Sequence, residues 1–454
     1  MHRSLLALAL AAATGVAPAA AQVLPHPITV DRLPNGLTVV TAPFDSPGIV
    51  AHYVVVRVGA RDEVEPGHTG FAHFFEHMMF RGTERFPSGA YEALLQSLGA
   101  DNNANTGGDR TCYTTVLPAS ALPTLVDVEA DRFRNLAYPL EGFQTEAHTI
   151  WGEYLTAISD PMLRMEETLL SMAFTTHTYG HTVIGWPDDI KKMPEYYDFS
   201  VEFFRRFYTP DNAFVVVAGD VDRDALLALV TEKLGGWDRR LDAPEVPVEP
   251  GQTEARQRHV DWPGPAPRRI FAAWKAPAFS VAGDGGAVDV AIELLFGETS
   301  DVYRRLVVEE RKLLSLEPWT GWDRDPTLVV LDAKLADGFS FDEAVAAFQA
   351  AIDDLAAGNV DPQRIDEVKS HVRWAVPMAL ETPADVAGLL TRVISAVGDP
   401  GALEAYVARL GTITADDVVR VAAQWLRAAH RNVVTLAPAP PPPADAAAGE
   451  GGAP

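Results

Sequence analysis

The segment His73-Phe74-Phe75-Glu76-His77 is the most informative stretch of this sequence. Positions i and i+4 share one face of an α-helix, so the imidazoles of His73 and His77 can converge on a single ion. Glu76 lies on nearly the same face and can sit beside that ion without binding it. Zinc accepts two neutral imidazoles and one carboxylate and leaves a fourth position for water. The segment therefore predicts a zinc-binding helix with a carboxylate placed for proton transfer.

The residues around the motif predict that this helix is buried. Phe71–Phe80 is apolar on most faces, and buried ionisable groups need partners. A helix with two structural histidines and a surface glutamate, the alternative interpretation, would leave them without any. The third metal ligand should be an acidic residue from another element, and position alone does not choose among the downstream carboxylates Glu141, Glu146, Glu153, Glu166 and Glu167.

Outward from this helix, the first half of the chain has the pattern of an α+β unit. Asn35-Gly36 lies between two apolar stretches and predicts a hairpin, and the valine-rich Ile49–Val58 predicts a buried strand. Ser88 is the expected N-cap of a helix over Ser88–Leu98, and Asp222 that of a helix over Asp222–Leu234. Further strands are expected at 101–106, 111–117 and 213–218, and further helices at 119–135 and 142–157.

The second half repeats this organisation weakly. Both halves begin with strands and end with a valine-rich strand, Phe214–Val217 and Val433–Leu436, which indicates an internal duplication. The expected strands are 269–275, 328–334 and 432–436, and the expected helices are 287–296, 302–311, 341–357 and 365–376. We therefore predict an α+β fold of two homologous domains, each a mostly antiparallel sheet packed with helices.

The predicted boundaries follow from shifts in composition. Residues 1–21 have a polar start, an apolar stretch and a small-residue cleavage region, which predicts a signal peptide and export to a periplasm or out of the cell. An N-terminal anchor helix is the alternative. The N-terminal domain then covers 22–237, a polar linker with prolines covers 238–258, and the second domain covers 259–436. Residues 437–454 are rich in Pro, Ala and Gly and should form a disordered tail.

Charge and cysteine content exclude several classes of protein. The chain has 454 residues with 62 acidic and 37 basic side chains, a net charge of -25. This balance argues against a nucleic-acid binder and favours, as a hypothesis, tolerance of basic peptides. After the first 21 residues there is no apolar stretch long enough for stable membrane insertion. The single cysteine, Cys112, excludes an intrachain disulfide.

The H-x-x-E-H motif and the downstream Glu153 resemble the pitrilysin-type (inverzincin) zinc peptidases, which include the mitochondrial processing peptidases. The resemblance implies that His73, His77 and Glu153 bind one zinc ion. It implies that Glu76 is the general base and that Glu146, two helical turns before Glu153, supports the site from nearby. For Glu146 alone, a solvated helix carboxylate is the alternative. Members of the family form a chamber or clamshell around short or unfolded peptides, so this chain would be one half of such a clamshell.

A second match to the family covers Gly99 to Tyr113. Asn103-Ala104 stands where the family has an Asn-Ala pair on a strand edge, followed by Thr106, Asp109 and Thr111-Cys112-Tyr113. An edge strand offers unpaired N–H and C=O groups to an extended peptide. The resemblance thus makes Asn103 and Ala104 candidates for substrate binding, whereas a plain hairpin is the alternative.

The second half departs from the family pattern. Active members usually carry a Ser-Arg-Leu helix start and a later Tyr, in the second domain or in a partner subunit. Here the corresponding stretch is 300–306, Asp301 replaces the Arg, and no Tyr occupies the later position. Three explanations remain: a heterodimer whose zinc-less homologous subunit supplies Arg and Tyr, a self-sufficient enzyme or homodimer, and a decayed second domain.

Two functions from other classes also remain open. One is a non-catalytic peptide-binding or assembly subunit of the same family. The other is a periplasmic solute-binding protein, which is suggested only by export and the two-domain organisation.

Overall fold

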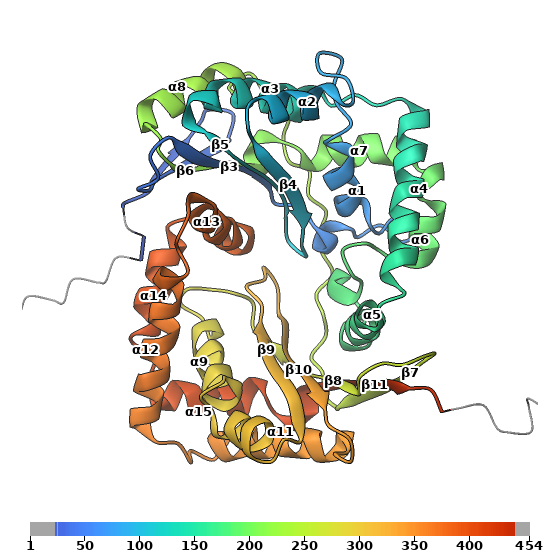
Figure 1. The fold of residues 1–454 in the computed structure, drawn as a ribbon, viewed down its shortest axis with the longest axis vertical. Helices are drawn as coiled ribbons and strands as arrows, with labels where there is room; N and C mark the ends of the chain where they lie inside the picture. The colour runs from blue at the N-terminus through green and yellow to red at the C-terminus, as the bar shows by residue number, and fades with distance from the viewer. Residues whose placement is uncertain (1–22, 25, 441–454) are drawn as a thin grey trace, which may run out of the picture.

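The computed structural model describes residues 23–24 and 26–440 (Figure 1). The structure contains two β-sheets, one from each half of the chain. They follow one another along the long axis of the molecule, and helices pack around them (Figure 1). The predicted mixed α+β class is therefore confirmed. The predicted signal peptide and residues 441–454 of the predicted tail lie outside the described residues.

The N-terminal sheet has the strand order β1-β2-β6-β3-β5-β4, so β4 is an edge strand. Neighbours are antiparallel except β2 and β6. The hairpin predicted at Asn35-Gly36 joins β1 to β2. The strands are β1 (Thr29–Arg32), β2 (Thr38–Pro43), β3 (Ile49–Val56), β4 (Asp101–Thr106), β5 (Thr111–Pro118) and β6 (Ala213–Gly219).

The C-terminal sheet repeats this topology. Its order is β7-β11-β8-β10-β9, and β7 and β11 are its one parallel pair. The order β2-β6-β3-β5-β4 has the same succession of parallel and antiparallel neighbours, which supports the predicted internal duplication. The strands are β7 (Arg256–Trp262), β8 (Arg269–Ala276), β9 (Leu313–Thr320), β10 (Thr327–Leu335) and β11 (Arg431–Pro438).

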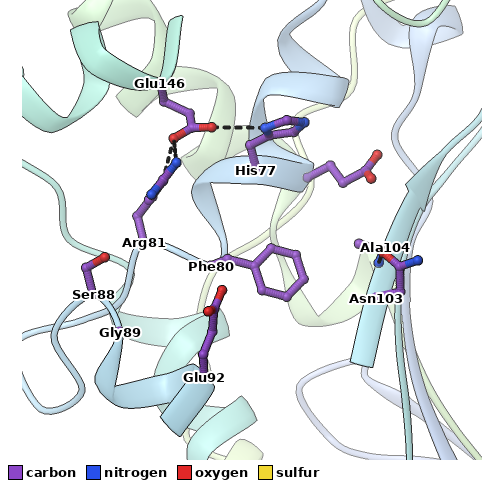
Figure 2. Close-up of a pocket in the computed structure, with 10 residues that line it drawn as sticks. His77, Phe80, Arg81, Ser88, Gly89, Glu92, Asn103, Ala104 and Glu146 are labelled. Atoms are coloured by element: carbon purple, nitrogen blue, oxygen red, sulfur yellow. Dashed lines mark hydrogen bonds and ion pairs between the residues drawn. The ribbon is translucent and has the colours of Figure 1, made fainter. Parts of the chain in front are cut away.

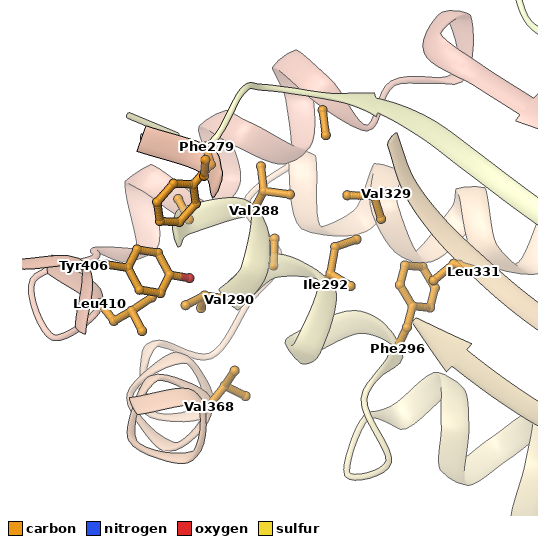
Figure 3. Packing of buried hydrophobic residues seen from close by; sticks show 14 of the residues in the cluster. Phe279, Val288, Val290, Ile292, Phe296, Val329, Leu331, Val368, Tyr406 and Leu410 are labelled. Atoms are coloured by element: carbon orange, nitrogen blue, oxygen red, sulfur yellow. The ribbon is translucent and has the colours of Figure 1, made fainter. Parts of the chain in front are cut away.

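One face of each sheet packs on helices from its own half. On the N-terminal sheet, α1, which carries the motif, contacts β4 and β5, α2 contacts β4, and α8 contacts β2. The helix α3 packs on α8, and α4 and α7 pack on α1. In the C-terminal half, Val288, Ile292 and Phe296 of α9 pack near Val329 and Leu331 of β10 (Figure 3). The helices are α1 (Phe71–Met78), α2 (Ala90–Ser97), α3 (Leu122–Asn135), α4 (Leu140–Ala157), α6 (Pro187–Lys192), α7 (Tyr197–Phe207), α8 (Arg223–Leu234), α9 (Gly285–Phe296), α11 (Phe341–Ala356), α12 (Pro362–Met378), α14 (Ala402–Leu410) and α15 (Ala415–Trp425).

The opposite face of each sheet is covered by a helix from the other half. The helix α13 (Pro383–Val397) packs on β3 and β6 of the N-terminal sheet, and α5 (Pro161–Ala173) packs on β7 and β11 of the C-terminal sheet. Alternate residues of β3 face the two sides: Val54 packs with α1, and Val55 lies in the core that includes α13. A sheet with two apolar faces must bury both. Each half therefore buries one face of its sheet against a helix from the other half.

Several predicted boundaries need correction. The N-cap of α2 is Gly89 and not Ser88, because the chain enters this helix through a left-handed residue (φ 82°) that favours glycine. The helix predicted at 302–311 is a short turn, α10 (Asp301–Tyr303), followed by a π-helical segment, Arg304–Glu309. The predicted linker overlaps β7, which begins at Arg256, and β11 continues to Pro438 into the predicted tail.

Within residues 23–24 and 26–440, no single helix is both long and apolar enough to cross a membrane. Only the bent pair α13 and α14, whose axes differ by 90°, reaches that length and hydropathy when taken together.

Candidate metal centre

The start of the motif helix α1 is fixed by Gly70 and by the side chain of Glu63. Gly70 precedes it with a left-handed φ of 89°, and a Cβ there would lie 2.5 Å from the carbonyl oxygen of Ile184. The buried carboxylate of Glu63 accepts hydrogen bonds from the backbone N–H groups of Gly70 and Ala72, each at 2.7 Å. Hydrogen-bond acceptors at this end are favourable, because the first N–H groups of a helix have no intrahelical partner. Glu63 therefore sets where the helix starts.

The two histidines of α1 converge with one carboxylate of α4. Nε2 of His73 lies 3.8 Å, and Nε2 of His77 3.5 Å, from Oε2 of Glu153. The three candidate ligand atoms all lie within 4.8 Å of one another. His73 is buried and Glu153 is exposed, so the cluster opens toward solvent on one side. The structure thus brings together the three ligands that the resemblance implied.

Glu146 does not join the candidate ligands but forms a hydrogen bond with one of them, His77 (Figure 2). Its Oε1 is 2.9 Å from Nδ1 of His77, and its other oxygen is bound by Arg81. The carboxylate is 1% exposed. Because Glu146 accepts the Nδ1 proton, the Nε2 lone pair of His77 is left facing Glu153. The solvated alternative for Glu146 is therefore wrong.

The charges around the two histidines differ. Burial, and then the neighbouring His77, lowers the pKa of His73 to about 4, so His73 is neutral near pH 7. Burial also opposes the charged form of His77, but the hydrogen bond and charge of Glu146 outweigh it and raise the pKa of His77. The hydrogen bonds from His77 and Arg81 lower the pKa of Glu146 despite its burial.

Glu76 points from α1 toward the edge strand β4. Its Oε2 accepts a hydrogen bond of 2.6 Å from the hydroxyl of Thr106. Burial raises the pKa of Glu76, and the bond from Thr106 partly offsets that rise. Glu76 is not among the converging ligand atoms.

A cavity of about 380 Å³ lies beside Glu76 and His77, between α1, the start of α2 and β4 (Figure 2). Asn103 and Ala104, predicted from the resemblance, line it on the open edge of the sheet. The lining residues are Glu76, His77, Phe80, Arg81, Ser88, Gly89, Glu92, Asn103, Ala104 and Glu146. An extended peptide added to β4 would therefore pass directly in front of Glu76.

Sequence reasoning missed two residues of this site, Glu63 and Arg81, and assigned no role to a third, Thr106. Glu63 gives no local signal, because its partners are backbone N–H groups seven and nine residues later. Arg81 follows the motif directly, but its pairing with Glu146 depends on tertiary packing. Thr106 was noticed only as part of the family pattern. Of the other candidate ligands, Glu167 bonds to the hydroxyl of Tyr154 and does not join the cluster.

The donor set fits zinc. Ligand atoms bound to zinc at 2.0–2.1 Å in a tetrahedron are about 3.4 Å apart, close to the 3.5 Å and 3.8 Å between the imidazole nitrogens and Glu153. The free Nε2 of His77 faces the same point, because Nδ1 is engaged by Glu146. Two imidazoles and one carboxylate, with a further carboxylate alongside, form the class of site that zinc peptidases use.

Comparison with known proteins agrees with this class. Residues 39–186 match "Insulinase (Peptidase family M16)" and residues 197–372 match "Peptidase M16 inactive domain". The chain therefore belongs to the M16 (insulinase and pitrilysin) peptidase family.

Relatives and solved structures extend the match over most of the chain. Zinc protease PqqE of Helicobacter pylori is 25% identical over 414 residues, 89% of this chain and 92% of that protein. The structure of a protease from Helicobacter pylori has a TM-score of 0.82 at 25% identity, and the match covers 91% of this chain and 100% of the other. The periplasmic protease PqqL of Escherichia coli has a TM-score of 0.74 at 19% identity, which shows the fold alone. That match covers 92% of this chain and 49% of PqqL, so this fold occurs there as one half of a longer chain.

Proposed function

We propose that this protein is an exported, zinc-dependent endopeptidase that hydrolyses short or unfolded peptides. The observation that carries the proposal is the convergence of His73, His77 and Glu153 in front of an open edge strand, with Glu76 between them and that strand. The names of relatives such as zinc protease PqqE support it.

His73, His77 and Glu153 would hold one zinc ion per chain. When bound, zinc lowers the pKa of a coordinated water to about 7 and polarises a carbonyl group. Glu76 then accepts a proton from the attacking water and delivers it to the leaving amine. Glu146 keeps the Nδ1 proton of His77 in place and so fixes the orientation of the ring. The backbone of Asn103 and Ala104 aligns the substrate as an added strand, which accounts for tolerance of different sequences.

We also propose that the active species is a heterodimer with a zinc-less homologue. The two arginines nearest the missing position are engaged on their own segment, because Arg304 bonds to Asp301 at 2.7 Å and Arg305 lies 4.0 Å from Glu310. We therefore propose that a partner, rather than Arg304 or Arg305, supplies the substrate-binding Arg and Tyr. Assays of the chain alone and with the co-purified homologue test this, and full activity of the isolated monomer contradicts it.

Export rests on residues 1–21 and is supported by the periplasmic location in the name of PqqL. N-terminal sequencing of the mature protein from a cell fraction outside the cytoplasm should begin at Gln22. An intact N-terminus or a cytoplasmic location contradicts this part of the proposal.

A non-catalytic peptide-binding subunit is the second candidate, and the match of residues 197–372 to an inactive-domain description favours it. Elemental analysis and one variant separate the two. The proposed enzyme contains about one zinc per chain, and Glu76→Gln retains the zinc while the rate falls by about 10²-fold or more. A native protein without zinc, or a Glu76→Gln variant with unchanged peptide cleavage, refutes the peptidase.

A further inference from the structure

We propose that Thr106 is a positioning residue for Glu76, so that the strand that receives the peptide also orients the proton-transfer group. This inference rests on the proposed function. It assigns a role to a residue that the sequence pattern singled out without one.

The first observation is the bond itself. The hydroxyl of Thr106 donates to Oε2 of Glu76 at 2.6 Å, and the pair is partly buried. Within residues 23–24 and 26–440, no other side chain donates a hydrogen bond to Glu76 and no basic group forms an ion pair with it. A free glutamate side chain has rotamer entropy to lose on being fixed. Thr106 therefore restrains a carboxylate that nothing else in this part of the chain holds.

The second observation is that the end of β4 is itself fixed. The turn after Thr106 is held by the N–H of Arg61, which donates to the carbonyl of Gly108 at 2.9 Å. The carboxylate of Asp109 accepts the hydroxyl of Tyr179 at 2.6 Å and the N–H of Arg324 at 2.8 Å. Arg324 lies in the loop between β9 and β10 of the C-terminal half. The hydroxyl that holds Glu76 is thus anchored from both halves of the molecule.

The third observation is the strand geometry. Side chains alternate along β4, so Ala104 and Thr106 point to the same face, and both are less exposed than their neighbours Asn103 and Asn105. The open edge of β4 runs past this face. With Oε2 engaged by Thr106, the other oxygen of Glu76 stays free to exchange a proton with water beside a peptide bound on that edge.

The test compares Thr106→Val, which removes the hydroxyl at nearly constant shape, with Thr106→Ser, which keeps it. Thr41→Val is the matched control, because Thr41 is buried in β2 of the same sheet and its hydroxyl has no partner among the described residues. We expect Thr106→Val to lower kcat about tenfold with KM changed less than about twofold and zinc content unchanged. Thr106→Ser and Thr41→Val should stay close to wild type.

Two results would overturn the inference. One is a Thr106→Val enzyme with wild-type kcat, and the other is a Thr106→Ser enzyme as slow as Thr106→Val, since then the methyl group and not the hydroxyl matters. Crystal structures give a readout independent of turnover: Glu76 should change rotamer or lose order in Thr106→Val, and an unchanged Glu76 counts against the role. If the wild-type protein with its partner cleaves no peptide, the proposed function fails instead, which is a separate outcome.

Discussion

Nδ1 of His77 lies 2.9 Å from the buried carboxylate of Glu146, two helical turns before Glu153 on the same helix. One helix thus supplies both a candidate metal ligand and the group that orients another ligand, and Arg81 holds the far oxygen of Glu146. Because these contacts form one network, removal of Glu146 should weaken metal binding.

The first prediction concerns this network. Glu146→Gln should weaken zinc affinity by about 10- to 100-fold, because His77 loses the charged acceptor that fixes its ring. Competition with a zinc chelator measures the affinity. Glu141→Gln, on the exposed first turn of the same helix, is the control and should bind zinc like wild type. Equal affinities of the two variants would contradict the orienting role.

The second prediction is loss of the metal when an imidazole is removed. His73→Ala or His77→Ala should contain less than about one tenth of the zinc of wild type after dialysis, because two ligands rarely retain the ion. His68→Ala is the matched control, since its ring packs against Tyr196 and Phe199 away from the cluster. Zinc retained in both motif variants would place the metal elsewhere.

The third prediction concerns the exchanged helices. Leu390 of α13 is fully buried, so Leu390→Ala should lower the free energy of unfolding by about 2–5 kcal/mol. Leu314→Ala, at a position that is 64% exposed, should change it little. Chemical denaturation measures both. A small effect at Leu390 would mean that the packing of α13 contributes little to stability.

The same exchange predicts how fragments behave. Residues 22–237 expressed alone lack α13 and leave one apolar face of β3 and β6 uncovered. The fragment should therefore aggregate or remain unfolded, and co-expression with residues 238–440 should restore a soluble complex. Circular dichroism and size-exclusion chromatography report the outcome, and a well-folded monomeric fragment would show that the halves are independent domains after all.

The fourth prediction is a pH dependence of stability. Burial raises the pKa of Asp62 to about 6 from its ordinary 3.8, although Arg324 and Arg61 oppose the rise. A raised folded-state pKa adds stability at low pH that is lost as the pH rises through about 6. Asp62→Asn removes this dependence, so its stability relative to wild type should improve by about 2 kcal/mol between pH 4.5 and pH 7.5. The exposed Asp224→Asn controls for the chemical change. A difference of opposite sign would contradict the assignment.

The fifth prediction concerns substrate charge. The net charge of -25 should favour basic peptides over acidic ones at low ionic strength, and added salt should reduce the difference. Cleavage rates of Lys/Arg-rich and Asp/Glu-rich peptide libraries of equal length measure the preference. Equal cleavage rates of the two libraries at low salt would contradict a preference for basic peptides.

Local pattern was sufficient for a large part of the fold. The helical spacing within Phe71–Phe80 and the valine-rich run of β3 can be recognised over a few residues, because such patterns are local properties of the sequence. The helices α5 and α13 were not predicted, and each packs on a sheet face of the distant half. The helices α7, α14 and α15 were also not predicted, although they pack on helices of their own half. Capping at Asp222 was confirmed, whereas Ser88 was displaced by the left-handed Gly89.

For the candidate site, the sequence by itself determined which chemistry is possible. His73, Glu76 and His77 share one helical face because they are neighbours on one helix, and no tertiary contact is needed for that. Only the tertiary structure decided that Glu153 joins the imidazole pair as the third candidate ligand, whereas Glu146 bonds to Nδ1 of His77. It also decided that Glu63 and Thr106 hold α1 and Glu76. The reason is physical: periodicity specifies neighbours along a helix, but the packing of separate elements determines which side chains meet across them.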